Sequence, residues 1–90
     1  MRVDISTFGT SLVSRPIGRE AALTLRSNVL RDTPAAETIE LDFTNVLVLT
    51  PSWTDEFITL LRAEYGSRIK IISGTNASVL LTMETIGEKI

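Results

Sequence analysis

The chain has 90 residues, of which 43% are hydrophobic, and its nine basic and eleven acidic side chains give a formal net charge of −2. This length predicts one small domain over residues 1–90, with enough apolar content to bury a core. The acidic balance and the lack of a basic run argue against nucleic-acid binding. The sequence has no histidine and no cysteine, so the commonest general base, the commonest zinc ligand and all thiol chemistry are missing.

The chain carries no signal for a membrane or for secretion. Its apolar runs are far shorter than the roughly 20 residues that a membrane-spanning helix needs. The first residues, Met1-Arg2-Val3-Asp4-Ile5, include charges and lack an apolar block, unlike a secretory signal. We therefore expect a cytoplasmic protein without membrane association, cofactor or metal.

The first third of the chain predicts a strand and then a helix. Residues 1–6 alternate apolar and charged side chains, which is typical of a short strand. Ser14-Arg15-Pro16 then resembles a helix entry, because serine can cap free amide groups and proline is tolerated in the first turn. The helix ends at Asp32-Thr33-Pro34. Its predicted apolar stripe consists of Ile17, Ala21, Leu25 and Val29, with Ala22 and Leu30 beside them.

The segment from Thr38 to Phe43 alternates with a period of two, which predicts a strand with one buried face. Ile39, Leu41 and Phe43 form that face. Residues 46–49 are apolar on both sides, as in a strand deep inside a sheet. We interpret them as a bent continuation of the preceding strand.

The second half predicts a helix over residues 52–65, a strand over 68–73 and a final helix over 77–86. The resulting β-α-β-α-β-α order predicts an α/β domain with a mostly parallel sheet of about four strands and helices mainly on one face. The apolar faces expected for the two helices are Trp53, Phe57, Leu60 and Leu61, with Ile58 at the border, and Val79, Leu80, Met83 and Ile86.

The segment Thr50-Pro51-Ser52-Trp53-Thr54-Asp55-Glu56-Phe57 marks the start of the second helix. Two capping schemes fit it: Thr50 caps and Pro51 is the first helical residue, or Ser52 caps with Asp55 three residues later. Either scheme places a hydroxyl at the positive end of the helix dipole. A helix start alone explains the pattern. Open α/β sheets, however, also tend to have their binding sites where the carboxyl end of a strand is followed by a helix.

In order and spacing, these residues resemble the STAS-like bacterial domains, which are relatives of the STAS domains of anti-sigma-factor antagonists. The resemblance rests on Ile39-Glu40-Leu41-Asp42-Phe43 with Val46, on Ser52-Trp53-Thr54-Asp55-Glu56-Phe57, and on Gly9 followed by Ser14-Arg15. It covers almost the whole chain and implies a single STAS-like domain.

In the antagonists, a serine or threonine at this strand-to-helix junction is phosphorylated by a partner kinase with a histidine-kinase-like ATPase fold. The resemblance therefore implies that Ser52 is the phosphoacceptor. This chain departs from the antagonists' pattern in that Thr50-Pro51 precede the serine and Trp53 stands where a glycine is usual. A phosphate would add about 1.5–2 negative charges, which Asp55 and Glu56 would oppose.

Further candidates surround this junction. The partner-binding candidates are Thr50, Ser52, Trp53, Asp55 and Glu56, although the position of Trp53 on the apolar stripe favours the core. Ser14 and Arg15 are candidates for anion binding at a helix N-terminus. Asp55 and Glu56 are not expected to share a metal, because adjacent helical residues point about 100° apart.

We expect a non-enzymatic regulatory module that binds a protein partner, a histidine-kinase-like ATPase. Two alternatives remain open. One is a small nucleotide- or anion-binding domain, against which stand the missing histidine and the lack of a glycine-rich phosphate loop. The other is a self-assembling homodimer, because an uncovered edge strand can pair with its own copy.

Overall fold

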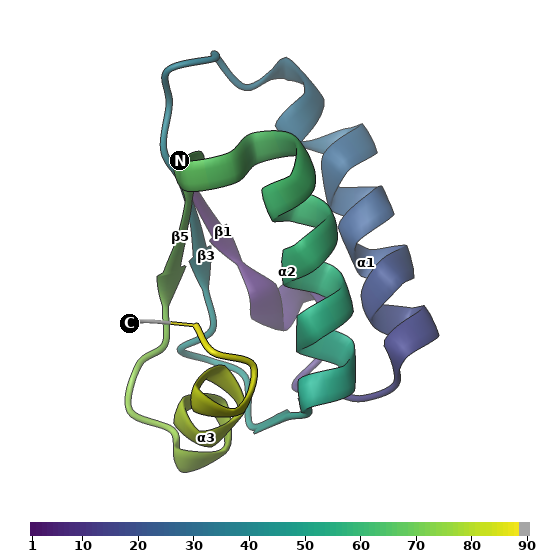
Figure 1. Ribbon diagram of the computed structural model, residues 1–90, viewed down its shortest axis with the longest axis vertical. Coiled ribbons are helices and arrows are strands. Elements are labelled where there is room, and N and C mark those ends of the chain that lie inside the picture. The colour runs from purple at the N-terminus through teal and green to yellow at the C-terminus, as the bar shows by residue number, and fades with distance from the viewer. Residues whose placement is uncertain (89–90) are drawn as a thin grey trace.

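The structure is a computed structural model that describes residues 1–88 (Figure 1), so the last two residues of the predicted domain lie outside the described part. Within these residues the helices are α1 (Arg15–Asn28), α2 (Pro51–Tyr65) and α3 (Ala77–Thr85), with short 3₁₀ helices η1 (Ile5–Phe8), η2 (Leu30–Asp32) and η3 (Gly66–Arg68). The strands are β1 (Arg2–Asp4), β2 (Ser11–Leu12), β3 (Ile39–Asp42), β4 (Val48–Leu49) and β5 (Ile69–Ile72).

The predicted α/β class is confirmed. Strands β1, β3 and β5 form a parallel sheet in that order, and β2 and β4 form a separate parallel pair. Helices α1 and α2 lie side by side against one face of the larger sheet, while α3 lies beyond its carboxyl end (Figure 1). None of the helices of residues 1–88 has both the length and the apolar character required to cross a membrane.

The interpretation of residues 46–49 as a bent continuation of β3 is wrong. A tight turn follows β3, in which the Val46 N–H donates to the Phe43 carbonyl at 3.1 Å. Strand β4 then pairs with β2 instead of joining the sheet of β3. The predicted single sheet of about four strands is therefore divided into a three-stranded and a two-stranded ladder.

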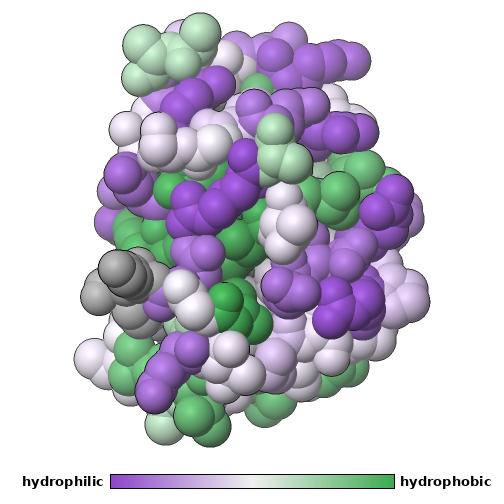
Figure 2. All heavy atoms as spheres, viewed as in Figure 1, coloured by the Kyte–Doolittle hydropathy of each residue, from purple (hydrophilic) through white to green (hydrophobic). Residues whose placement is uncertain are grey.

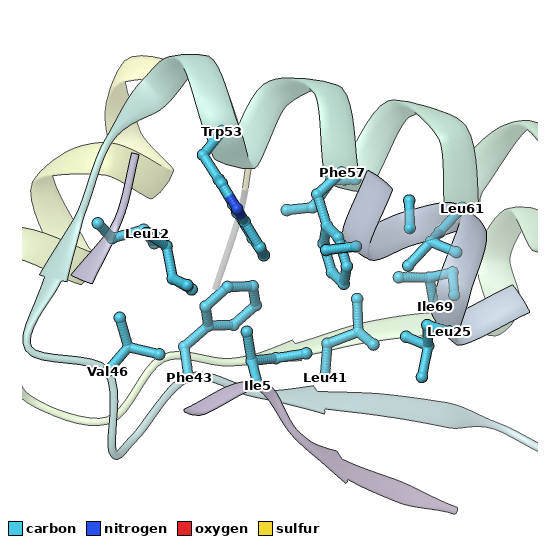
Figure 3. Packing of buried hydrophobic residues seen from close by; sticks show 14 of the residues in the cluster. Ile5, Leu12, Leu25, Leu41, Phe43, Val46, Trp53, Phe57, Leu61 and Ile69 are labelled. Carbon is cyan, nitrogen blue, oxygen red and sulfur yellow. The ribbon is translucent and has the colours of Figure 1, made fainter. Parts of the chain in front are cut away.

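The core lies between the sheet and the two long helices. The predicted inner face of β3 is confirmed, because Ile39, Leu41 and Phe43 are all fully buried. From α2, the indole of Trp53 points down toward the sheet beside Phe57 (Figure 3). The two rings stack with centroids 4.6 Å apart. Aromatic pairs of this kind add about 0.5–1.5 kcal/mol beyond the burial of their area.

The predicted stripe of α1 is wrong at both ends, since Ile17 is 60% exposed and Val29 is 41% exposed. The middle of the stripe is confirmed, because Ala21, Ala22 and Leu25 are buried, and Gly18 joins them on the buried face of α1. Small side chains allow α1 to approach α2 closely, and this approach turns the larger aliphatic residues toward the surface. A similar exchange occurs in α3, where Leu80 is exposed and Thr82 is buried.

Gly18 is the point of closest approach between the two helices. A Cβ atom added at this position would lie 2.9 Å from the Cα and the carbonyl carbon of Trp53, and closer still to its carbonyl oxygen. Real Cβ atoms essentially never come that close to backbone. Glycine at position 18 therefore fixes the start of α1 against the start of α2.

Helix α3 completes the free edge of β4. The Leu49 N–H donates to the Ser78 hydroxyl at 3.0 Å, and the Leu49 carbonyl accepts from the Thr82 hydroxyl at 2.8 Å. Two side chains thus satisfy backbone groups of Leu49 that would otherwise need a neighbouring strand. Because Thr50 follows directly, these bonds also position the start of α2.

Candidate functional site

The start of α2 follows the first of the two predicted capping schemes. Thr50 is the N-cap, with an extended backbone, and Pro51 is the first helical residue. The Thr50 side chain does not cap the helix, because its hydroxyl donates to the Leu12 carbonyl at 3.0 Å. The Thr50 N–H donates to the same carbonyl at 3.2 Å. This double contact ties the strand-to-helix junction to β2.

Ser52 is the second residue of α2 and its side chain is exposed. Strand β4 ends just before it, so the hydroxyl lies at the carboxyl end of a parallel pair and at the positive end of a helix. Figure 2 shows that hydrophilic residues gather over α1 and α2 on the viewed face. The sequence prediction of a displayed hydroxyl at this junction is thereby confirmed.

Trp53, the next residue, points toward the sheet and is fully buried. Consecutive helical residues lie about 100° apart, so the indole enters the core while the Ser52 hydroxyl stays outside. The Nε1 atom of Trp53 has no hydrogen-bond partner within residues 1–88. Trp53 is therefore a core residue, as its stripe position favours, and it is not available to a partner in this conformation.

The two acids beside Ser52 are held by α1. The Asp55 Oδ2 and Glu56 Oε2 atoms each lie 3.1 Å from Arg15 Nη1, and the Glu56 Oε1 atom lies 3.5 Å from Arg19 Nη1. Two carboxylates and two guanidinium groups thus make this surface nearly neutral. Hydrogen bonds to Asp55 first and to Glu56 second raise the pKa of Arg15 above its ordinary value.

The second predicted capping scheme, in which Ser52 caps the helix and Asp55 follows three residues later, is not observed. Because Thr50 rather than Ser52 is the cap, Asp55 and Glu56 lie in the second turn of α2 and the first turn contains no acid. Within residues 1–88 no group of three or more histidine, cysteine, aspartate or glutamate side chains gathers as metal ligands would.

Ser14 and Arg15 begin α1, as the sequence predicts. The Ser14 hydroxyl caps the helix by accepting from the Ile17 N–H at 3.4 Å, and Ser14 adopts a positive φ of 74°. Arg15 is occupied by Asp55 and Glu56. Anion binding by this pair stays a prediction, and it would require an anion that competes with two carboxylates for Arg15.

Sequence reasoning missed the pairing of Arg15 and Arg19 with the acids of α2. The pairing arises because Gly18 lets the two parallel helices meet at their starts. A glycine within an otherwise regular apolar stripe was the signal that could have indicated this close approach.

A hollow of about 450 Å³ lies at the opposite end of the two helices. Its charged and aromatic lining includes Arg26, Arg31, Glu64, Tyr65 and Arg68. Arg26 pairs with Glu64 at 3.7 Å, and Arg68 donates to the carbonyls of Pro34 and Glu37. These bonds give most of the hollow's cations a structural role.

Residues 21–79 match the family model of the STAS-like domain of unknown function (DUF4325). The chain belongs to this family. No curated protein and no solved structure matches it. The matched part of this STAS-like domain contains Ser52, Asp55 and Glu56, whereas Ser14 and Arg15 lie before it.

Proposed function

We propose that this STAS-like domain is a non-enzymatic regulatory module that binds a protein partner through the start of α2, and that Ser52 is its phosphoacceptor. One observation carries the proposal: the Ser52 hydroxyl is exposed at a helix N-terminus while the neighbouring Trp53 ring is buried. The bulky residue that replaces the antagonists' glycine thus leaves the approach to Ser52 free. The proposed partner is a histidine-kinase-like ATPase, as in the anti-sigma-factor antagonists that the sequence resembles.

The surface around Ser52 has the mixed character of a protein interface. Ser52 shares its side of the helix with Asp55 and Glu56, which follow it by three and four residues. Val13 and Val48 are exposed beside the junction, in segments tied to it through β2 and β4. Apolar contacts surrounded by charged side chains are the usual composition of a transient interface.

Phosphorylation would change the charge of this surface without changing its shape. A phosphate on Ser52 adds about 1.5–2 negative charges to a site where two acids now balance two arginines. The phosphate would compete with Asp55 and Glu56 for Arg15. Because the number of arginines stays the same, the surface would then carry a net negative charge. A partner that binds the neutral surface would then lose affinity, because like charges at an interface cost several kcal/mol.

The test uses ATPases of the histidine-kinase-like fold that are encoded beside the gene for this chain. Each is mixed with the domain and ATP, and phosphate incorporation is located by mass spectrometry. We expect about one phosphate on the wild-type chain and none on the Ser52→Ala variant. Ser67→Ala is the matched control, because Ser67 is an exposed serine in η3 at the other end of α2.

Equal phosphate incorporation into Ser52→Ala and the wild type would refute Ser52 as the acceptor. Absence of binding to every such ATPase would refute the partner. A thermal-shift screen with nucleotides, run in parallel, separates the alternative: stabilisation by several degrees with one nucleotide would favour a small nucleotide-binding domain.

A further inference from the structure

Strand β1 forms one edge of the three-stranded sheet, and no strand of residues 1–88 pairs with its outer side. The strand order is β1-β3-β5, and β1 pairs with β3 in parallel. The Met1 amino group donates to the Thr38 carbonyl just before β3, and the Met1 carbonyl accepts from the Glu40 N–H of β3. Alternate residues of a parallel strand bond to the same neighbour, so Val3 also bonds to β3. The N–H and C=O groups of Arg2 and the N–H of Asp4 point away from the sheet.

The side chains of β1 are complementary to those of an antiparallel copy. When Val3 lies opposite Val3 of the second copy, Arg2 of each chain lies opposite Asp4 of the other. Both charged residues lie on the sheet face that the helices do not cover, level with Glu40 and Asp42 of β3. A register centred on Arg2 or on Asp4 would oppose like charges, which destabilises a cross-strand pair. Charge therefore selects one register.

The apolar side of the same edge is also incompletely covered. A hollow of about 390 Å³ lies between β1 and α1. Its apolar lining consists of Met1, Val3, Phe8, Leu25 and Val29. Met1 is 37% exposed and Val29 is 41% exposed. A second copy related by a two-fold axis that passes between the two Val3 residues would bring the same side chains to this hollow from the other side.

The opposite edge of the sheet lacks this complementarity. Strand β5 reads Ile69-Lys70-Ile71-Ile72, and Lys70 is its one charged residue. No self-pairing of β5 can oppose unlike charges within the strand, and a central lysine on an edge strand discourages pairing. Charge therefore favours self-pairing at the β1 edge and disfavours it at the β5 edge.

We propose that this STAS-like domain forms a symmetric dimer through antiparallel pairing of β1 with β1 of a second copy, in the register that opposes Arg2 and Asp4. The pairing joins the two three-stranded sheets into one continuous sheet. The Asp4 carboxylate already caps η1, where its Oδ1 atom accepts from the N–H and the hydroxyl of Ser6, so Arg2 of the second copy would bind its other oxygen. To reach Asp4 of the second copy, Arg2 would lose only its contact of 3.9 Å with Asp42. The dimer leaves the start of α2 free, so it does not depend on the proposed partner.

The test is sedimentation velocity of the whole chain over a range of concentrations. We expect the wild type to show a monomer–dimer equilibrium, and the variants Arg2→Asp and Asp4→Arg each to raise the dimer Kd by about tenfold or more. Mixed together, the two variants should form a heterodimer, because one strand then carries two acids and the other two bases. Lys70→Asp is the matched control on the same sheet face at the other edge, and it should dimerise like the wild type.

A folding check and one further variant keep the test decisive. Asp4→Arg removes the η1 cap, so circular dichroism and the fluorescence of the single tryptophan must first show a folded chain. Arg2→Pro removes an outward N–H without removing a bond to β3, and it should weaken the dimer too. A wild type that stays monomeric at every concentration overturns the proposal. So does an Arg2→Asp variant that dimerises normally, or a mixture that does not associate.

Discussion

The first two turns of α2 have two sides with opposite properties. On the inner side, Trp53 and Phe57 are fully buried and stacked, and the buried Thr54 hydroxyl donates to the Thr50 carbonyl at 2.9 Å. On the outer side, Ser52 is exposed, and Asp55 and Glu56 pair with the exposed arginines Arg15 and Arg19. The inner side holds the shape of the helix start, so the outer side can change its chemistry at little cost in stability. Substitutions on the two sides should therefore have different consequences.

The largest effect is expected for Trp53→Ala on the inner side. Truncating a buried aromatic side chain costs about 3–5 kcal/mol, a large share of the roughly 5–15 kcal/mol that stabilises a domain. Urea unfolding followed by far-ultraviolet circular dichroism measures the loss. Trp53→Phe is the matched variant. It should cost less, because it keeps an aromatic ring against Phe57 and removes an N–H group that has no partner in residues 1–88. A loss below about 1 kcal/mol for Trp53→Ala would contradict the packing described here.

Gly18→Ala tests whether the contact between the helices fixes the inner side. Helix propensity alone predicts that alanine is better than glycine by about 1 kcal/mol. The close approach of Gly18 to the Trp53 backbone predicts the opposite sign, with a loss of about 1–3 kcal/mol from overpacking. Ser27→Ala, at an exposed site of the same helix, is the control and should stay within about 0.5 kcal/mol of the wild type. Stabilisation by Gly18→Ala would show that the helices are farther apart than described.

Arg15→Gln should have a smaller effect, because it breaks ion pairs on the outer side. Its side chain and that of Asp55 are each about half exposed, and exposed pairs contribute about 0–1 kcal/mol. The loss in unfolding free energy should therefore be at most about 1 kcal/mol and should fade at about 1 M salt, where the screening length is roughly 3 Å. Arg31→Gln, whose nearest acid is Asp32 at 3.9 Å, is the control. A loss that is equally large at high salt would mean that Arg15 acts through packing and not through charge.

The parts of this fold that the sequence predicted are those with one-sided burial over several residues. The strand of Ile39, Leu41 and Phe43 alternates with a clear period, so its inner face was predicted correctly. Strands β2 and β4 have two residues each, which is too short for any period. The middle of the α1 stripe was predicted correctly, because Ala21, Ala22 and Leu25 are buried. Its ends were placed wrongly, because Ile17 and Val29 continue the apolar spacing in the sequence but lie beyond the contact with α2.

The candidate site followed the same pattern. Ser52 and its exposure could be predicted, because the strand, the proline and the helix start are consecutive in the sequence. The ion pairs of Arg15 and Arg19 could not, because they connect residues about 40 positions apart and depend on which helices become neighbours. Long-range charge pairing leaves no periodic trace in a single sequence.

The most direct test of the regulatory proposal measures how tightly the proposed ATPase partner binds when the outer side alone is changed. Isothermal titration compares the wild type with Ser52→Asp and with Ser67→Asp, after circular dichroism has shown that all three are folded. We predict that Ser52→Asp keeps wild-type stability to within about 0.5 kcal/mol but binds at least about tenfold more weakly, a loss of roughly 1.4 kcal/mol. Ser67→Asp should bind like the wild type. Equal affinity of all three chains for the partner would contradict a regulatory surface at Ser52.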